Sequence, residues 1–189
     1  MVNKLYKSAL GFIVGALLLS ILWPYKHQLI DFDLEPDFAV LESNEIYFNN
    51  TRIVHYKTTE SEDLNTAGFK VHRMTKFQKD SVKTHFNFAI INHWREDRAY
   101  IVLEPINPSL FSDTINIAVG DTMMKLQIDH MDYRDHYNFA SEIFKRSLNY
   151  ELPYMVNDAD STLLFGTKPN GKTNEVILKD YFRLIGRFR

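Results

Sequence analysis

The chain has 189 residues, of which 22 are Lys or Arg and 24 are Asp or Glu, so its formal charge is −2. It contains no cysteine, which excludes disulfide bonds, a cysteine nucleophile and thiolate metal sites. Removing Lys4 and Lys7 leaves 20 basic and 24 acidic residues, and this acidic balance argues against nucleic-acid binding. The composition predicts one globular domain of ordinary size that is held together by its core.

The first predicted element is a membrane-spanning helix over residues 5–25. No charged residue lies between Lys7 and Lys26, and an apolar run of this length can cross about 30 Å of hydrocarbon as a helix. Pro24 lacks an amide hydrogen and therefore ends the predicted helix.

Aromatic and small residues occupy positions that suit a membrane helix. Tyr6 precedes the apolar run, and Trp23 and Tyr25 follow it, where interfacial aromatic residues anchor a span. Gly11 and Gly15 are four residues apart, a spacing that lets two membrane helices approach closely. The run therefore predicts an anchor with possible helix–helix association through the two glycines.

The flanking charges predict the orientation of the span. Lys4 and Lys7 precede it, whereas acidic residues follow it from Asp31 onward. Positive residues favour the cytoplasmic side, so we expect a single-pass protein of the plasma or inner membrane, with a cytoplasmic N-terminus and the domain outside. A cleaved signal peptide and a buried core helix are the two alternatives. The run lacks the small residues of a cleavage site and the polar stripe of a core helix.

Beyond a predicted juxtamembrane linker at residues 26–37, the pattern predicts strands first and helices later. Strands are expected where aromatic and β-branched residues alternate with polar ones, and turns where Asn, Gly or Pro interrupts them. The expected strands are 38–41, 69–74, 82–94, 99–103 and 161–165, with hairpins at 45–57, around Asn49-Asn50, and 114–128, around Gly120-Asp121. Helices are expected at 133–148 and 174–188, a loop at 58–66 and a turn at 169–171; a strand is an alternative for 174–188.

The strand predicted at residues 82–94 has the clearest alternation. One face would be buried and would carry Phe86, Phe88, Ile90 and Trp94; the other would face solvent or a partner and carry His85, Asn87 and His93. Grouped strands followed by grouped helices are typical of an α+β fold. We therefore predict an N-terminal transmembrane helix and then a mostly antiparallel α+β domain over residues 38–189.

The most suggestive polar cluster lies at residues 129–136. His130, Asp132 and His136 are metal-ligand types, and Asp132 and His136 would share a helix face at a spacing of four. The alternative is structural: Asp132 would cap the helix, and His136 would sit on its solvent face. No phosphate-binding glycine loop or nucleophile motif accompanies the cluster, and we expect no cofactor.

The residue pattern favours a non-catalytic envelope domain that binds another protein or assembles into a membrane complex. One alternative is a membrane-anchored hydrolase or metal-dependent enzyme that uses the cluster at 129–136. Another is a small-ligand sensor or transport accessory domain, because mixed α+β domains often contain pockets.

Overall fold

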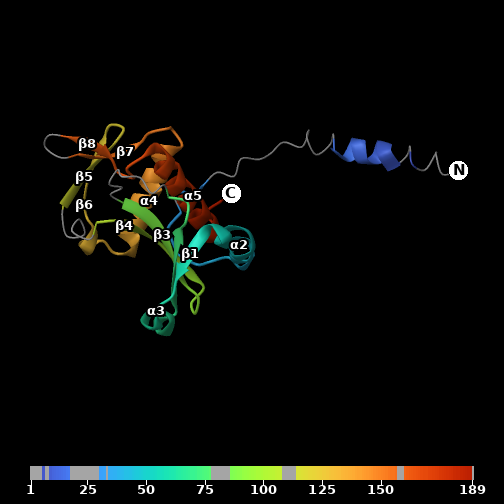
Figure 1. Cartoon of the computed structure of the whole chain (residues 1–189), viewed down its shortest axis with the longest axis horizontal. Helices are drawn as coiled ribbons and strands as arrows, with labels where there is room; N and C mark the ends of the chain where they lie inside the picture. Colours follow the sequence, from blue (N-terminus) through green and yellow to red (C-terminus); the bar gives the residue numbers. More distant parts are fainter. Residues whose placement is uncertain are drawn as a thin grey trace. The chain divides into compact units, whose positions relative to one another are not determined.

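The structure is a computed structural model that describes residues 6, 9–17, 30–32, 34–77, 86–107, 114–156 and 160–188. Two four-stranded antiparallel sheets and five helices give the described part of the chain an α+β architecture, which confirms the predicted class (Figure 1). Ile30–Phe188 forms one compact unit, and Met1–Leu29 belongs to another.

The first unit contains the predicted anchor. Residues 9–17 are helical, and a Cβ added to Gly11 or Gly15 would meet no atom within 4 Å. Within the described residues, we find no helix that combines the length and the apolar character needed to cross a membrane. Trp23 and Tyr25 lie outside the described residues, so the span over 5–25 stays a prediction.

The first sheet carries the confirmed strands of the first half of the domain. Its order is β1-β2-β3-β4, and every neighbouring pair is antiparallel. The strands are β1 (Tyr56–Thr59), β2 (Phe69–Met74), β3 (Phe86–His93) and β4 (Arg98–Pro105). In β3, Phe86, Phe88 and Ile90 are buried as the alternation predicts. Trp94 lies beyond β3 in the turn and is exposed, so its predicted place in the core is wrong.

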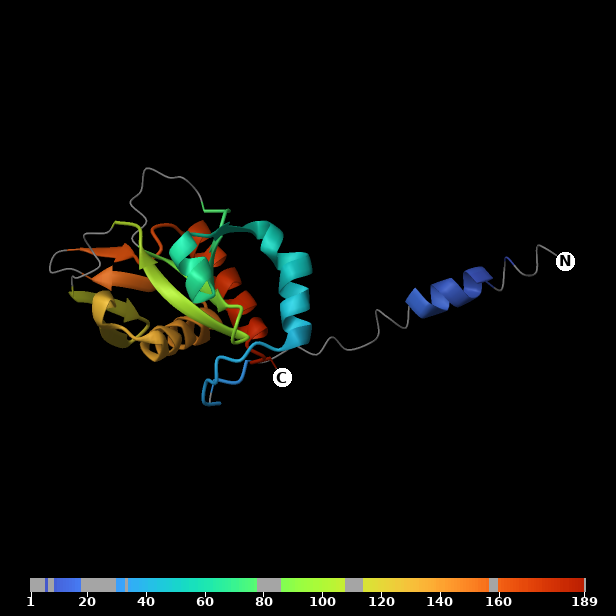
Figure 2. The same ribbon diagram turned by 90° about the horizontal axis from the view of Figure 1, so that it is seen from below.

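The second sheet has the order β6-β5-β7-β8 and lies at the opposite end of the domain from α2 (Figures 1 and 2). Its strands are β5 (Thr114–Val119), β6 (Thr122–Gln127), β7 (Pro153–Val156) and β8 (Ser161–Leu163). The hairpin around Gly120-Asp121 is confirmed. The sequence pattern does not predict β7, because Pro153 reads as a stop after the helix, although proline is tolerated as the first residue of a strand.

Two long helices cover the inner face of the first sheet. Helix α4 (Tyr133–Ser147) begins at Asp132, whose carboxylate accepts the amides of Arg134 and Asp135 in a capping box. Helix α5 (Lys168–Leu184) begins at Thr167, whose hydroxyl accepts the amide of Asn170. The turn predicted at 169–171 is therefore wrong: proline in the first helical turn replaces an amide that would have no partner inside the helix.

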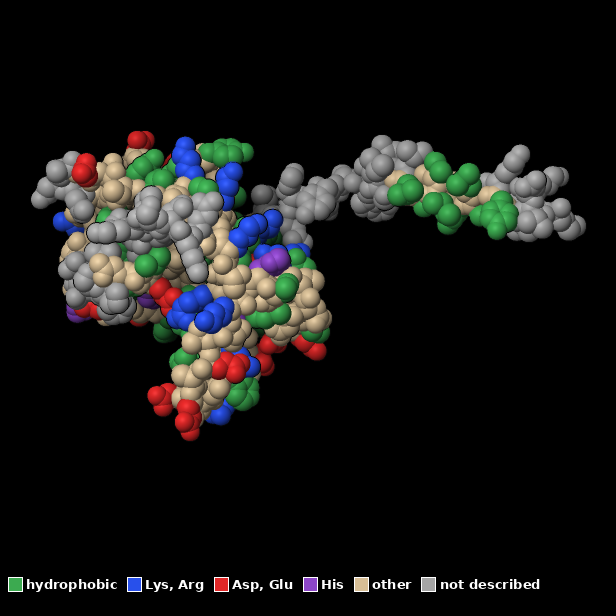
Figure 3. Space-filling view, viewed as in Figure 1, with side chains coloured by type: hydrophobic (Ala, Val, Ile, Leu, Met, Phe, Trp, Pro, Cys, Tyr) green, Lys and Arg blue, Asp and Glu red, His purple; other side chains and the backbone are tan. Residues whose placement is uncertain are grey.

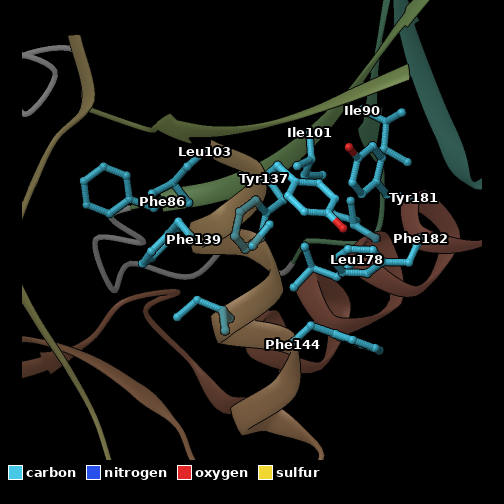
Figure 4. Close-up of a cluster of buried hydrophobic side chains, with 14 of the residues drawn as sticks. Phe86, Ile90, Ile101, Leu103, Tyr137, Phe139, Phe144, Leu178, Tyr181 and Phe182 are labelled. Carbon is cyan, nitrogen blue, oxygen red and sulfur yellow. The ribbon is translucent and has the colours of Figure 1, made fainter. Parts of the chain in front are cut away.

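The core lies between the first sheet and these helices. In Figure 4, Phe86, Ile90, Ile101 and Leu103 point from the sheet toward Tyr137 and Phe139 of α4 and toward Leu178, Tyr181 and Phe182 of α5. Phe144 packs on Phe182, with ring centroids 5.6 Å apart. The helix predicted at 133–148 is confirmed; Tyr137, Ala140, Ile143 and Phe144 form its buried stripe, whereas Leu148 is exposed.

The hairpin predicted at 45–57 is wrong. The segment forms helix α2 (Glu42–Tyr47), a π-helical turn η1 (Phe48–Arg52) and a 3₁₀ turn η2 (Ile53–His55) before β1. Short apolar runs fit a strand and a helix equally well, and here contacts with α5 decide. The Arg183 guanidinium lies 4.1 Å from the centroid of the Tyr47 ring, and Arg52 pairs with Asp180.

The loop predicted at 58–66 is also wrong over most of its length. It contains the end of β1 and helix α3 (Glu62–Ala67), which projects from the body of the domain in Figure 1. Ser61 caps α3 by accepting the amide of Leu64, and Gly68 ends it with φ of +86°. Side-chain polarity predicted a loop, but the cap residue and the terminal glycine are helix signals.

The two ends of the compact unit meet. Ile30 forms an isolated antiparallel bridge with Phe188, and the Asp31 amide donates to the Arg187 carbonyl at 2.9 Å. The Arg187 guanidinium donates to the carbonyl of Glu35 at 2.6 Å. Residues from Ile30 onward in the predicted linker are thus bound to the C-terminal segment.

The buried side chain of Asn174 accepts a backbone amide of β3 that has no partner in the neighbouring strand. Strand β2 pairs with β3 only from Ile90 to His93, so the Phe88 amide has no partner in β2. The side-chain oxygen of Asn174 accepts that amide at 2.8 Å, and its nitrogen donates to Asn170 and Asn87. Helix α5 is therefore joined to the sheet by a directed polar contact as well as by apolar packing.

We expect Asn174→Ala to lower the free energy of unfolding by about 1–3 kcal/mol, because a buried amide loses its acceptor. Asn87→Ala removes only the partly exposed end of the same network and should cost under about 1 kcal/mol. Asn138→Ala on the exposed face of α4 is the control, and equilibrium unfolding in urea measures all three. Equal losses for Asn174→Ala and Asn138→Ala would contradict the assigned role.

Candidate functional site

The residues of the predicted metal cluster serve different structural purposes. The side chain of His130 is 73% exposed, and its ring lies 3.9 Å from the Asp129 carboxylate. Asp132 is committed to capping α4. Among the described residues, no three His, Asp or Glu side chains are arranged to hold a metal ion.

His136 is buried, so its predicted place on the solvent face is wrong. Its Nδ1 accepts the amide of Leu103 at 3.2 Å, an amide on the edge of β4 that faces away from β3. In the neutral ring, this bond places the proton on Nε2. Burial lowers the pKa of His136, and the carboxylates of Asp135 and Asp132 oppose that change only in part.

A hollow of about 640 Å³ is lined by several basic side chains, and we call it the basic groove. It lies between α5, the η1–η2 turns and the end of β2. Its lining residues are Arg52, His55, Met74, Lys76, Lys168, Pro169, Lys172, Thr173 and Val176. In the space-filling view, Lys and Arg side chains lie over α5 and beside the α2–η2 segment, whereas Asp and Glu side chains lie mainly farther out (Figure 3).

One wall of the basic groove is the first half of α5. Lys168, Lys172 and Val176 are spaced by four residues, which places them along one face of the helix. Both lysines are exposed. The Thr167 cap fixes where α5 begins and thus which face of the helix these residues occupy.

The Arg52 side of the groove is held by a partly buried ion pair. Nε of Arg52 donates to both oxygens of Asp180 at 2.9 Å, and the Tyr56 hydroxyl donates to the same carboxylate at 2.8 Å. Burial, followed by the Asp180 charge, raises the pKa of Tyr56, which keeps its donor protonated. Among the described residues, neither Nη atom of Arg52 has a hydrogen-bond partner, so both remain available to the groove.

The charge of the basic groove opposes the charge of the domain. Removing Lys4, Lys7, Lys26 and Arg189 leaves 18 basic and 24 acidic residues in 30–188, a formal charge of −6. Among the described residues, no Asp or Glu lines the groove and the groove lysines form no ion pair. Beside the groove, burial raises the pKa of Glu175 while Lys172 lowers it. The groove is therefore a local concentration of positive charge, in which Arg52 is paired with Asp180 and the lysines form no ion pair within the described part of the chain.

A second hollow, the sheet pocket, lies on the outer face of β2–β4 and has a volume of about 510 Å³. Its wall includes Val71, Ile91 and Val102, and the Tyr100 and Tyr133 rings lie 5.7 Å apart at its rim. His136 is the only titratable residue other than these tyrosines in its lining. The outer face of the first sheet is thus apolar around Val71, Ile91 and Val102, whereas Asn87 lies on the same face beside the Arg73–Glu104 ion pair, as the predicted polar face requires. The predicted His85 lies outside the described residues.

The sequence does not reveal either hollow. Arg52 was placed in a hairpin and Pro169 in a turn, so their proximity could not be inferred. The spacing of Lys168, Lys172 and Val176 could have indicated one wall of the groove. It predicts a shared helix face only if the helix predicted at 174–188 is extended back to Thr167.

Comparison of the chain with known protein families, characterised proteins and solved structures finds no match. The two hollows are therefore interpreted from their own chemistry.

The buried His136 predicts a pH dependence of stability. Its folded pKa lies below the unfolded value of about 6.5, so the unfolded chain takes up the proton first and stability falls as the pH drops below about 6.5. One such group contributes a slope of at most about 1.4 kcal/mol per pH unit. We expect His136→Asn, which can still accept the Leu103 amide, to flatten the slope between pH 6.5 and 5 in urea unfolding.

His130→Asn is the matched control, because that side chain is exposed. Burial, followed by the charge of Lys70, lowers the pKa of a second buried histidine, His72, to about 4. Because both variants retain His72, the free energy of unfolding keeps some pH dependence in each of them. Slopes that do not differ between the His136 and His130 variants would contradict the role of His136.

Proposed function

We propose that this chain is a membrane-anchored, extracytoplasmic binding domain without catalytic activity, and that it holds an anionic partner in the basic groove. The observation that carries the proposal is the groove itself: four Lys and Arg side chains and His55 around one hollow of a net acidic domain. Opposite charge attracts a partner from a distance and fixes its orientation on arrival.

The location rests on the sequence. The uncharged run before Lys26, the basic residues before it and the acidic residues after it favour a retained single span with the domain outside. A protein partner in the envelope fits both the anchoring and the groove. Association of two copies through Gly11 and Gly15 would be a separate interaction within the membrane.

A second candidate function is supported by the sheet pocket. An apolar hollow with one fixed hydrogen-bond donor, Nε2 of His136, is the arrangement by which small apolar ligands are held in many proteins. This observation favours a ligand sensor or transport accessory domain over an enzyme that uses residues 129–136.

We expect a reporter fused after Arg189 to be active only outside the cytoplasm, and the protein to remain in the membrane pellet after alkaline carbonate washing. A retained apolar helix resists such washing, whereas a peripheral protein is released. A mature chain that begins after Ser20, identified by N-terminal sequencing, would overturn the retained anchor.

The groove is tested with a generic polyanion. We expect the full-length chain to bind immobilised dextran sulfate and Lys168→Glu/Lys172→Glu to weaken the affinity about thirtyfold, because two attractions of about 0.5 kcal/mol become repulsions of similar size, a change of about 2 kcal/mol. Surface plasmon resonance at two salt concentrations measures the effect, which should shrink at high salt.

Lys125→Glu/Lys145→Glu is the control, because it makes the same charge change at exposed positions outside the groove. Its affinity should stay within about twofold of the parent. If the two double variants lose affinity equally, net charge explains the binding and the groove does not.

A further inference from the structure

We infer that the occupant of the basic groove is an extended acidic segment of a partner protein that carries an apolar side chain between its carboxylates. This inference rests on the proposed function and names the ligand class of the same site. Four features of the groove support it: its length, the distribution of its charges, the lack of a phosphate cradle at the start of α5 and its apolar floor.

The groove is longer than a compact anion. Lys168 and Val176 lie eight residues apart on α5, which corresponds to about 12 Å at the helical rise of 1.5 Å per residue. An extended chain advances about 3.3 Å per residue, so this wall matches three or four residues of a strand-like segment.

The cations are distributed along two walls. Lys168 and Lys172 lie on α5, whereas Arg52 comes from the η1 turn and Lys76 from the segment after β2. Asp180 fixes Arg52 through Nε and leaves both Nη atoms without a partner among the described residues, whereas the lysines are free of ion pairs there. Several separated carboxylates satisfy this arrangement better than one anion, which could reach only part of it.

The start of α5 does not form a phosphate cradle. The amide of Asn170 is taken by the Thr167 hydroxyl at 3.2 Å, and Pro169 has no amide hydrogen. Phosphate sites at helix starts depend on free backbone amides that converge on one anion. The positive charge here comes instead from side chains, most of them flexible lysines that act as point charges.

The floor of the groove is apolar. Met74 is buried, and Val176 and Pro169 are exposed toward the hollow. An apolar side chain of a peptide can cover this floor while its acidic neighbours reach the walls. A flat bilayer surface would leave a concave floor of this kind uncovered, so a peptide fits better than a membrane.

The test uses the full-length chain in non-ionic detergent and a fluorescein-labelled peptide, Gly-Glu-Glu-Leu-Glu-Glu-Gly-Ser. Fluorescence anisotropy should show saturable binding that a Gln-for-Glu peptide does not reproduce. We expect Lys168→Glu/Lys172→Glu to lose at least tenfold in affinity and Lys125→Glu/Lys145→Glu less than twofold. Replacing the Leu of the peptide by Ala, or Val176→Asp in the protein, should each weaken binding about threefold or more.

Competition experiments distinguish a failure of this inference from a failure of the proposed function. Inorganic phosphate, and micelles doped with phosphatidylglycerol, should displace the peptide only weakly. If either binds in a manner that requires Lys168 and Lys172 while the peptide does not bind, the acidic-segment inference is wrong and the proposed function stands. If the peptide, phosphate and lipid all bind independently of those lysines, both fail.

Discussion

Helix α5 packs against the core of the first sheet on one side and against the η1 turn on another, and the remaining structure depends on these two contacts. Ile177, Leu178 and Tyr181 are fully buried in the core beneath the first sheet. Asp180 reaches the other partner, Arg52, and a buried carboxylate of this kind is tolerated only when paired. The spacing between α5 and the η1 turn, and therefore the width of the basic groove, is set by the same contacts that close the core.

The basic groove combines one fixed cation with several mobile ones. Arg52 is oriented by Asp180, so its two Nη atoms, which have no partner in the described part of the chain, keep their direction whether or not a ligand is present. The exposed lysines can adjust to the spacing of an incoming anion at the cost of side-chain entropy. Their mutual repulsion is tolerable in water because exposed charges are strongly screened, and a bound anion would relieve it.

Patterns were reliable where the alternation or the helical period was clear. The alternation of Phe86, Phe88 and Ile90, the Gly120-Asp121 hairpin and the stripe of α4 all follow from local periodicity, and all are present in the structure. The prediction for the α2–η2 segment failed because contacts with α5 determine its conformation. One of these contacts joins Arg52 to Asp180, which lie 128 residues apart in the chain. The groove could not be predicted for the same reason, because its lining residues come from 52–76 and 168–176, which are far apart in the sequence.

The position of helix α5 after all the strands in the chain constrains the order of folding. The core cannot close until α5 is present, and α5 follows every strand of the first sheet in the chain. While α5 is still missing from a nascent chain, the part of the inner face of β3 and β4 that α5 contacts is uncovered. Until α5 has been made and has packed, the domain therefore depends on whatever shields that apolar sheet from aggregation.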